Sequence, residues 1–160
     1  MVGVIVAIVI LLAYTLSMIK HIGKTPGSLS ASVFWLEYNQ KIIWTIVLYA
    51  VCFLCLPTYL DKTSENTQFL AFIAIAALAF VGAAPLVKNS KEMAYKVHCI
   101  AAAICAACSQ LVLIFNCPIL LLCWIPFIIA AITTGWKDWR TRIFWGEAVC
   151  FTSTFLYCLI

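Results

Sequence analysis

Two ionisable side chains, His98 and Glu147, interrupt stretches of sequence that are otherwise strongly apolar. A charge at the centre of a bilayer costs about 2.5–3.5 kcal/mol or more unless it is paired or reached by water. An ionisable residue in such a stretch is therefore a candidate for a functional site. An imidazole beside a carboxylate can hold a ligand or pass a proton, and we predict that Glu147 pairs with His98.

The segment PGSLSASVFWLE, residues 26–37, adds hydroxyl groups to this pair. Ser28 or Ser30 could act with His98 and Glu147 as a nucleophile, a base and an orienting carboxylate. These four residues are the catalytic candidates if the protein is an enzyme. The sequence indicates no oxyanion hole beside them, so we expect a protein without enzymatic activity.

Weakly polar residues follow both ionisable side chains at helical spacing, which places each set on one helix face. The first stripe consists of His98, Ala102, Cys105 and Ser109, with Tyr95 one turn earlier, and the second of Glu147, Cys150, Thr154 and Cys158. Two such stripes predict two helices that face each other. The predicted ligand-binding residues are Ser28, Ser30, Tyr95, His98, Ser109 and Glu147.

The nine cysteines include two Cys-x-x-Cys pairs, Cys52 with Cys55 and Cys105 with Cys108. Four thiolates at one depth could bind zinc. In apolar helices, however, a free cysteine behaves as a small hydrophobic residue. We therefore expect no metal site, no cofactor and no structural disulfide. The sequence also lacks a Gly-rich phosphate loop, H-E-x-x-H and G-x-S-x-G.

The composition shows which elements must position these residues. Of 160 residues, 66% are hydrophobic and 10% are charged, whereas a soluble domain is about half apolar and a quarter charged. Runs of about 20 apolar residues span a bilayer as helices. We predict an all-α protein, a single six-helix transmembrane bundle over residues 1–160. Its spans are Val2 to Ile19, Ile42 to Leu60, Thr67 to Val87, Met93 to Phe115, Ile119 to Thr134, and Ile143 to the end.

The basic residues predict the orientation of this bundle. Nine of the ten fall in the first, third and fifth connections, and only Lys62 falls on the other side. Positive residues stay cytoplasmic, so both termini should lie outside the cytoplasm. The net charge of +4 then indicates attraction to anionic lipid, with no nucleic-acid partner. An aromatic belt is predicted at the cytoplasmic boundary from Trp35, Trp44, Trp136, Trp139 and Trp145.

The first connection is long for so small a protein and too apolar to lie freely in water. We predict that it folds back on the bundle as a short interfacial helix, with Ser28 or Ser30 as the N-cap. Its serines would then lie near His98 and Glu147. Among the prolines, Pro126 is expected to kink the fifth helix and Pro85 to help end the third.

Several short motifs together resemble the six-span membrane proteins of the Frag/DRAM/Sfk group. The chain is also similar to small membrane proteins of gut bacteria and their phages with the pattern SLSA…FVGAAP…VH…FWGE. The matching positions are Pro26, Ser28, Leu29, Ser30, Phe80, Val97, His98, Phe144 and Glu147. The resemblance implies a six-helix bundle and, for some members, a link to lipid homeostasis. A more remote likeness to zinc-dependent ceramidases fails, because those enzymes need three histidines and this chain has His21 and His98 only.

Three functions remain open from the sequence. The first is binding of a membrane lipid, or of a partner membrane protein, through a polar pocket on the cytoplasmic side. The second is an intramembrane hydrolase with a Ser/His/Glu site. The third is a small proton-coupled transporter or channel, which would have to be a homo-oligomer because the chain has no inverted repeat.

Overall fold

The computed structural model describes residues 1–30, 33–34, 36–87, 91–133 and 139–160. It is all-α with six helices, as predicted. Three short 3₁₀ segments, η2 (Glu65–Thr67), η3 (Ala84–Leu86) and η4 (Pro118–Cys123), connect some of them. The helices are α1 (Val2–Ile22), α2 (Tyr38–Lys62), α3 (Gln68–Ala83), α4 (Lys91–Asn116), α5 (Trp124–Thr133) and α6 (Trp139–Leu159).

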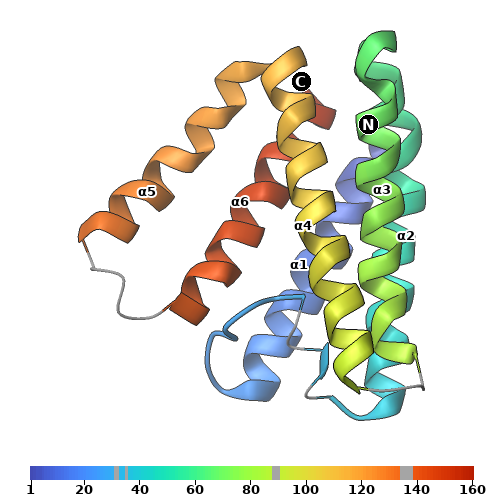
Figure 1. Cartoon of the computed structure of the whole chain (residues 1–160), viewed down its shortest axis with the longest axis vertical. Coiled ribbons are helices and arrows are strands. Elements are labelled where there is room, and N and C mark those ends of the chain that lie inside the picture. Colours follow the sequence, from blue (N-terminus) through green and yellow to red (C-terminus); the bar gives the residue numbers. More distant parts are fainter. Residues whose placement is uncertain (31–32, 35, 88–90, 134–138) are drawn as a thin grey trace.

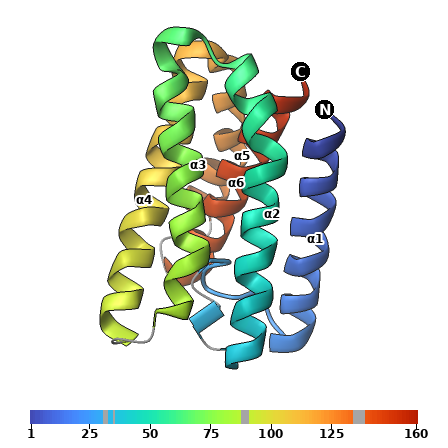
Figure 2. The same ribbon diagram turned by 90° about the vertical axis from the view of Figure 1, so that its right-hand side faces the viewer.

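The long helices form an elongated bundle, and α5 lies obliquely at its side (Figure 1). Helix α3 packs between α2 and α4, α1 packs on α2, and α6 contacts α1, α2 and α4. The two termini lie at one end of the bundle, and the first connection lies at the other (Figure 2). The first connection therefore meets the end of α3 and the starts of α4 and α6.

Four helical segments are long and apolar enough to cross a membrane: Val2–Ile22, Tyr38–Lys62, Glu65–Leu86 and Glu92–Asn116. Large apolar side chains also cover the outside of the bundle. On α1, for example, Val9 and Leu16 are more than half exposed. Exposed apolar surface on this scale needs a partner such as lipid. The chain is thus a small helical protein that crosses the membrane several times.

The last third of the chain departs from the predicted pair of spans. Residues Pro118–Thr133 form a shorter apolar segment, of which only Trp124–Thr133 is α-helical. Pro126 lies in the first turn of α5, where a backbone N–H has no intrahelical partner to lose. The predicted kink at Pro126 is therefore wrong. Pro85 does follow the end of α3 and opens η3.

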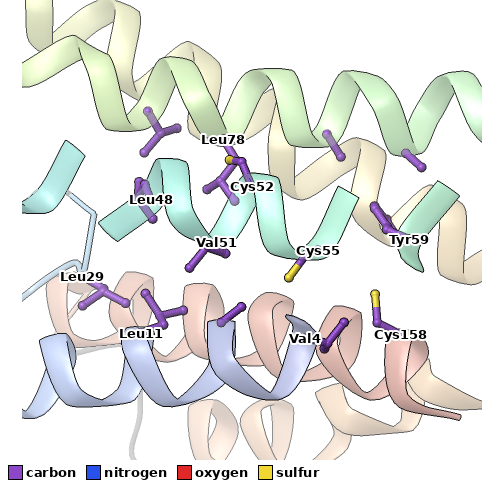
Figure 3. Packing of buried hydrophobic residues seen from close by; sticks show 14 of the residues in the cluster. Val4, Leu11, Leu29, Leu48, Val51, Cys52, Cys55, Tyr59, Leu78 and Cys158 are labelled. Carbon is purple, nitrogen blue, oxygen red and sulfur yellow. The ribbon is translucent and has the colours of Figure 1, made fainter. Parts of the chain in front are cut away.

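Small residues allow close helix contacts that bring the polar groups into register. A Cβ at Gly82 would lie 3.1 Å from the Leu48 Cβ, so α3 and α2 approach closely there. At the same level the Thr45 hydroxyl donates to the Gly82 carbonyl over 2.6 Å. Val51 and Cys55 point from α2 toward α1 and α6 (Figure 3). All nine cysteines are free thiols, and Cys55 packs in the apolar core.

The first connection folds back on the bundle, as predicted. Leu29 and Val33 are buried, and Phe34 packs edge-on against His98 with ring centroids 5.1 Å apart. The Phe144 N–H donates to the Gly27 carbonyl over 3.2 Å, which fixes the segment to α6. The interfacial helix predicted here includes residues 31, 32 and 35, which lie outside the described residues. The hydroxyls of Ser28 and Ser30, predicted as N-caps, contact Glu147 instead.

Candidate functional site: a polar cluster at one end of an internal cavity

The Glu147 carboxylate is held by three consecutive residues of the first connection. The Leu29 N–H donates to it over 2.7 Å and the Ser30 N–H over 3.3 Å. The Ser28 hydroxyl lies 3.0 and 3.1 Å from its two oxygens, and the Ser30 hydroxyl donates to Oε1. These donors occupy the lone pairs that a carboxylate offers. They therefore stabilise Glu147 in a partly buried position on α6.

His98 completes the cluster from α4. The side chain is 1% exposed. Its Nδ1 lies 3.3 Å from the Val81 carbonyl of α3, and its Nε2 lies 3.1 Å from the Ser30 hydroxyl. The predicted proximity of Ser28, Ser30, His98 and Glu147 is confirmed. In the described part of the chain, however, Ser30 bridges His98 and Glu147, and no direct hydrogen bond joins them.

The Ser30 hydroxyl lies between two possible hydrogen-bond acceptors, Nε2 of His98 and the carboxylate of Glu147. The Val81 carbonyl can only accept, so Nδ1 of His98 carries a hydrogen. The Ser30 hydroxyl has one hydrogen to give, either to Glu147 or to Nε2 of His98. The single hydroxyl hydrogen of Ser30 can therefore be donated in only one of these two contacts.

The arrangement differs from that of a serine hydrolase. In a catalytic triad the carboxylate accepts from the histidine nitrogen that faces away from the serine. Here that nitrogen faces the Val81 carbonyl, and the carboxylate contacts the serine. The N–H groups of Leu29 and Ser30, which would be the nearest oxyanion donors, point to Glu147. The geometry gives the hydrolase prediction no support.

A cavity of about 280 Å³ lies beneath the cluster, between α2, α3, α4 and α6. Ser30 and Glu147 line one end, and Tyr59 and Cys158 line the other. Both predicted stripes face this space: Ala102, Cys105 and Ser109 from α4, and Glu147, Cys150, Thr154 and Cys158 from α6. The prediction that the two helices present their weakly polar faces to each other is thus confirmed.

Three residues that line the cavity each carry a buried polar atom with no hydrogen-bond partner within the described part of the chain: Trp44 Nε1, Tyr59 OH and Thr154 Oγ1. Trp44 and Tyr59 are each 1% exposed. The prediction that Trp44 belongs to an interfacial belt is therefore wrong, while Trp145 is exposed; Trp35 and Trp136 lie outside the described residues. One signal in the sequence could have shown this burial: Trp44, Leu48, Val51, Cys55 and Tyr59 recur at helical spacing.

The remaining predicted site residues lie away from the cluster. Tyr95 is half exposed and packs on Phe34 with ring centroids 5.6 Å apart. Ser109 lines the cavity, and its hydroxyl donates to the Ala106 carbonyl over 3.0 Å. Sequence reasoning missed Gln110, which accepts from the Trp124 indole over 2.8 Å and donates to Ser153 over 3.4 Å. A polar amide within an apolar helix is the signal that could have found it.

The described residues hold no group of three or more His, Cys, Asp or Glu side chains that could bind a metal ion. No model of a known protein family matches the chain, and neither a curated protein nor a solved structure matches it significantly. The resemblance to the Frag/DRAM/Sfk group thus stays a prediction, and the function has to be argued from the cluster and the cavity.

Proposed function

We propose that the protein binds a membrane amphiphile in the cavity between the helices, with the polar end of the ligand near Ser30 and Glu147. The cavity itself is the observation that supports this function. Protein interiors are close-packed and contain few voids larger than a water molecule. A space of about 280 Å³ between the helices is far larger than such voids.

The surroundings indicate which kind of molecule fills this space. The outer surface of the bundle faces lipid, so acyl chains are the most abundant apolar molecules available. The cavity wall is mostly apolar, and its polar groups concentrate where Ser30 and Glu147 close one end. With the basic connections cytoplasmic, the polar end of the ligand would lie at the cytoplasmic leaflet.

Two neighbouring alanines of α4 provide the test. Ala106 lines the cavity, whereas Ala107 is exposed on the outside of the bundle. We expect Ala106→Phe to fill the cavity and abolish co-purification of lipid, measured by native mass spectrometry after exchange into a lipid-free detergent. Ala107→Phe should retain lipid as the wild type does. Equal lipid retention by both variants, or no lipid in the wild type, would contradict the proposal.

The chain of polar contacts from His98 through Ser30 to Glu147 favours a second function, proton-coupled transport. Its measurement is the internal pH of proteoliposomes that carry a pH-sensitive dye. If transport is the function, Ser30→Ala should abolish proton uptake because it removes the bridge, and Ser28→Ala should not. No uptake by the wild type under an imposed gradient would reject this alternative and leave binding.

A further inference from the structure

We infer that the ligand enters the cavity sideways from the membrane, through an opening between α4 and α6, and that Gln110 and Trp124 hold the far edge of this opening. The inference rests on the proposed function and adds the route by which a membrane lipid reaches the site. It is supported by the burial of the lining residues, by two polar bridges between α4 and α6, and by the side chains between and outside these bridges.

The burial of the lining residues shows which side of the cavity is open. On α2 every lining residue is buried, and on α3 every lining residue except Ile75 is buried. Most lining residues of α4 and α6 are instead partly exposed, among them Ala102, Ala106, Gly146 and Cys150. Helices α2 and α3 therefore form the closed back of the cavity, and α4 and α6 border its open side.

Two polar bridges join α4 to α6 and bound this open side. At the end of the first connection the bridge is Ser30, which contacts both helices. Farther along, Gln110 of α4 donates to Ser153 of α6 over 3.4 Å and accepts from the Trp124 indole over 2.8 Å. Trp124 also lines the cavity from the start of α5. The opening thus lies between the levels of Glu147 and Ser153, which are about 9 Å apart along α6 at 1.5 Å per residue.

Small residues lie on both edges of the opening between these bridges. Ala102 and Ala106 line the edge on α4, and Gly146 lines the edge on α6. A Cβ at Gly146 would have its nearest contact at 3.9 Å, on Phe127 of α5. Small residues usually let membrane helices pack closely, whereas here a cavity lies between them. Their short side chains leave a path that larger ones would block.

The surface around the opening is apolar. Ile104 of α4 is 42% exposed, and Ile143 of α6 is 39% exposed and also lines the cavity. Helix α5 lies obliquely at the side of the bundle (Figure 1), and its Ile128 is about half exposed. In a protein that crosses the membrane, these side chains face acyl chains. A lipid can therefore pass from the bilayer into the cavity without exposing its chain to water.

The rate of ligand exchange tests this route on the purified full-length protein in detergent. Bound monooleoylglycerol is replaced by its deuterated form, and native mass spectrometry follows the replacement. Gln110→Met removes both hydrogen bonds at the far edge, so we expect at least about 2-fold faster exchange. The equilibrium affinity should stay unchanged, because Gln110 does not line the cavity. A general loosening of the protein would change the affinity as well.

The matched control for this variant is Gln68→Met. Gln68 lies at the start of α3 and donates to the Leu60 carbonyl over 3.0 Å, away from the opening. Its substitution also removes a side-chain hydrogen bond of a glutamine. We expect Gln68→Met to exchange monooleoylglycerol at the wild-type rate and with the wild-type affinity.

A larger side chain at Gly146 should have the opposite effect on the rate. We expect Gly146→Leu to slow the exchange, because it fills the path between α4 and α6. Ala148→Leu adds bulk two residues further along α6, at a position that does not line the cavity. This control should exchange at the wild-type rate.

Two native cysteines report on the opening without a ligand. Cys150 is partly exposed on the open side, whereas Cys55 is buried in the back wall. The small apolar reagent N-ethylmaleimide should alkylate Cys150 faster than Cys55, as measured by peptide mass spectrometry. Gly146→Leu should slow the alkylation of Cys150 and leave that of Cys55 unchanged.

The outcomes separate the inference from the proposed function. If the wild type neither retains lipid nor binds monooleoylglycerol, the function fails and the inference fails with it. If the wild type retains lipid but takes up no monooleoylglycerol, or if Gln110→Met and Gly146→Leu both exchange at the wild-type rate, the inference fails and the function stands. Alkylation of Cys55 as fast as that of Cys150 likewise overturns the inference alone.

Discussion

At the scale of single residues, Ser30 and Ser28 look alike in the sequence but differ in what depends on them. Ser30 is buried and bridges His98 and Glu147, whereas Ser28 is partly exposed and contacts Glu147 and Ser30 without reaching His98 in any hydrogen bond between described residues. We expect Ser30→Ala to lower the free energy of unfolding by about 1–3 kcal/mol, because it leaves buried Nε2 of His98 unsatisfied. Ser28→Ala should cost about 0.5–1.5 kcal/mol. Thermal unfolding in detergent micelles measures both, and equal losses would contradict the bridging role.

The coupling between His98 and Glu147 gives a second prediction. In the wild type, His98→Ala combined with Glu147→Leu should cost no more than the worse of the two changes, because residues of one hydrogen-bond network are not additive. In a Ser30→Ala background this coupling should vanish, and the two losses should add. Additive losses with Ser30 present would mean that His98 and Glu147 are energetically independent.

Two neighbouring tyrosines test what an unpartnered buried hydroxyl contributes. The rings of Tyr59 and Tyr157 pack edge to face, 6.0 Å apart. Tyr157 OH donates to the Lys62 carbonyl over 2.7 Å, whereas Tyr59 OH has no partner within the described chain. Tyr157→Phe should therefore lower the free energy of unfolding by about 1 kcal/mol, while Tyr59→Phe should be neutral or stabilising. A larger loss for Tyr59→Phe would show that a water molecule or a ligand satisfies its hydroxyl.

At the scale of elements, α1 to α4 and α6 follow the helices predicted from the sequence, and α5 does so only in part. Long apolar runs specify α1 to α4 because a helix is the one element that satisfies its own backbone in lipid. Pro118 opens the segment, which begins as 3₁₀ over Pro118–Cys123 and becomes α-helical only from Trp124. A hydropathy profile depends only on residue types, so it does not show that the first part of this segment is a 3₁₀ helix.

The candidate site could be predicted only in part, for a similar reason. Helical spacing placed Cys105, Ser109 and Thr154 on facing stripes, because a face is a local property of one helix. Ser30 contacts His98, which is 68 positions away in the sequence, and Glu147, which is 117 positions away. Which serine contacts which partner depends on how the first connection folds, and the helical spacing of residues does not specify that fold. Trp44 was assigned by residue type to the interface, although its spacing within α2 indicated the core.

Gly3 lies at a close contact between two helices, whereas Gly146 has open space around it. A Cβ at Gly3 would lie 2.8 Å from the Leu54 carbonyl oxygen of α2, whereas a Cβ at Gly146 would have its nearest contact at 3.9 Å, on Phe127. We expect Gly3→Ala to separate α1 from α2 and to lower the melting temperature. Gly146→Ala should raise it, since alanine is about 1 kcal/mol better than glycine within a helix. Thermal unfolding of both variants tests these two expectations. A higher melting temperature for Gly3→Ala would show that α1 does not pack closely on α2.

At the scale of the whole molecule, polar interactions lie at the two ends and apolar packing lies between them. At the end opposite the cluster, Asn116 accepts from the Ser64 N–H over 3.0 Å and donates to Thr67 over 3.0 Å. The cavity opens between these two polar layers, in the part of the bundle whose outer surface faces lipid. This division is what a lipid-binding bundle needs, because the chain of the ligand lies in the apolar zone while its polar end meets the cluster.

The orientation of the molecule decides which leaflet the cluster faces, and it can be tested at two exposed positions. Thr25 lies in the first connection and Ser64 between α2 and η2, at opposite ends of the bundle. In a background without the native cysteines, Ser64→Cys should react with a membrane-impermeant maleimide on intact cells, and Thr25→Cys should react only after permeabilisation. Neither substitution changes the basic residues that favour a cytoplasmic first connection. The reverse labelling pattern would place Ser30, His98 and Glu147 at the outer leaflet, and the ligand would then have to enter from there.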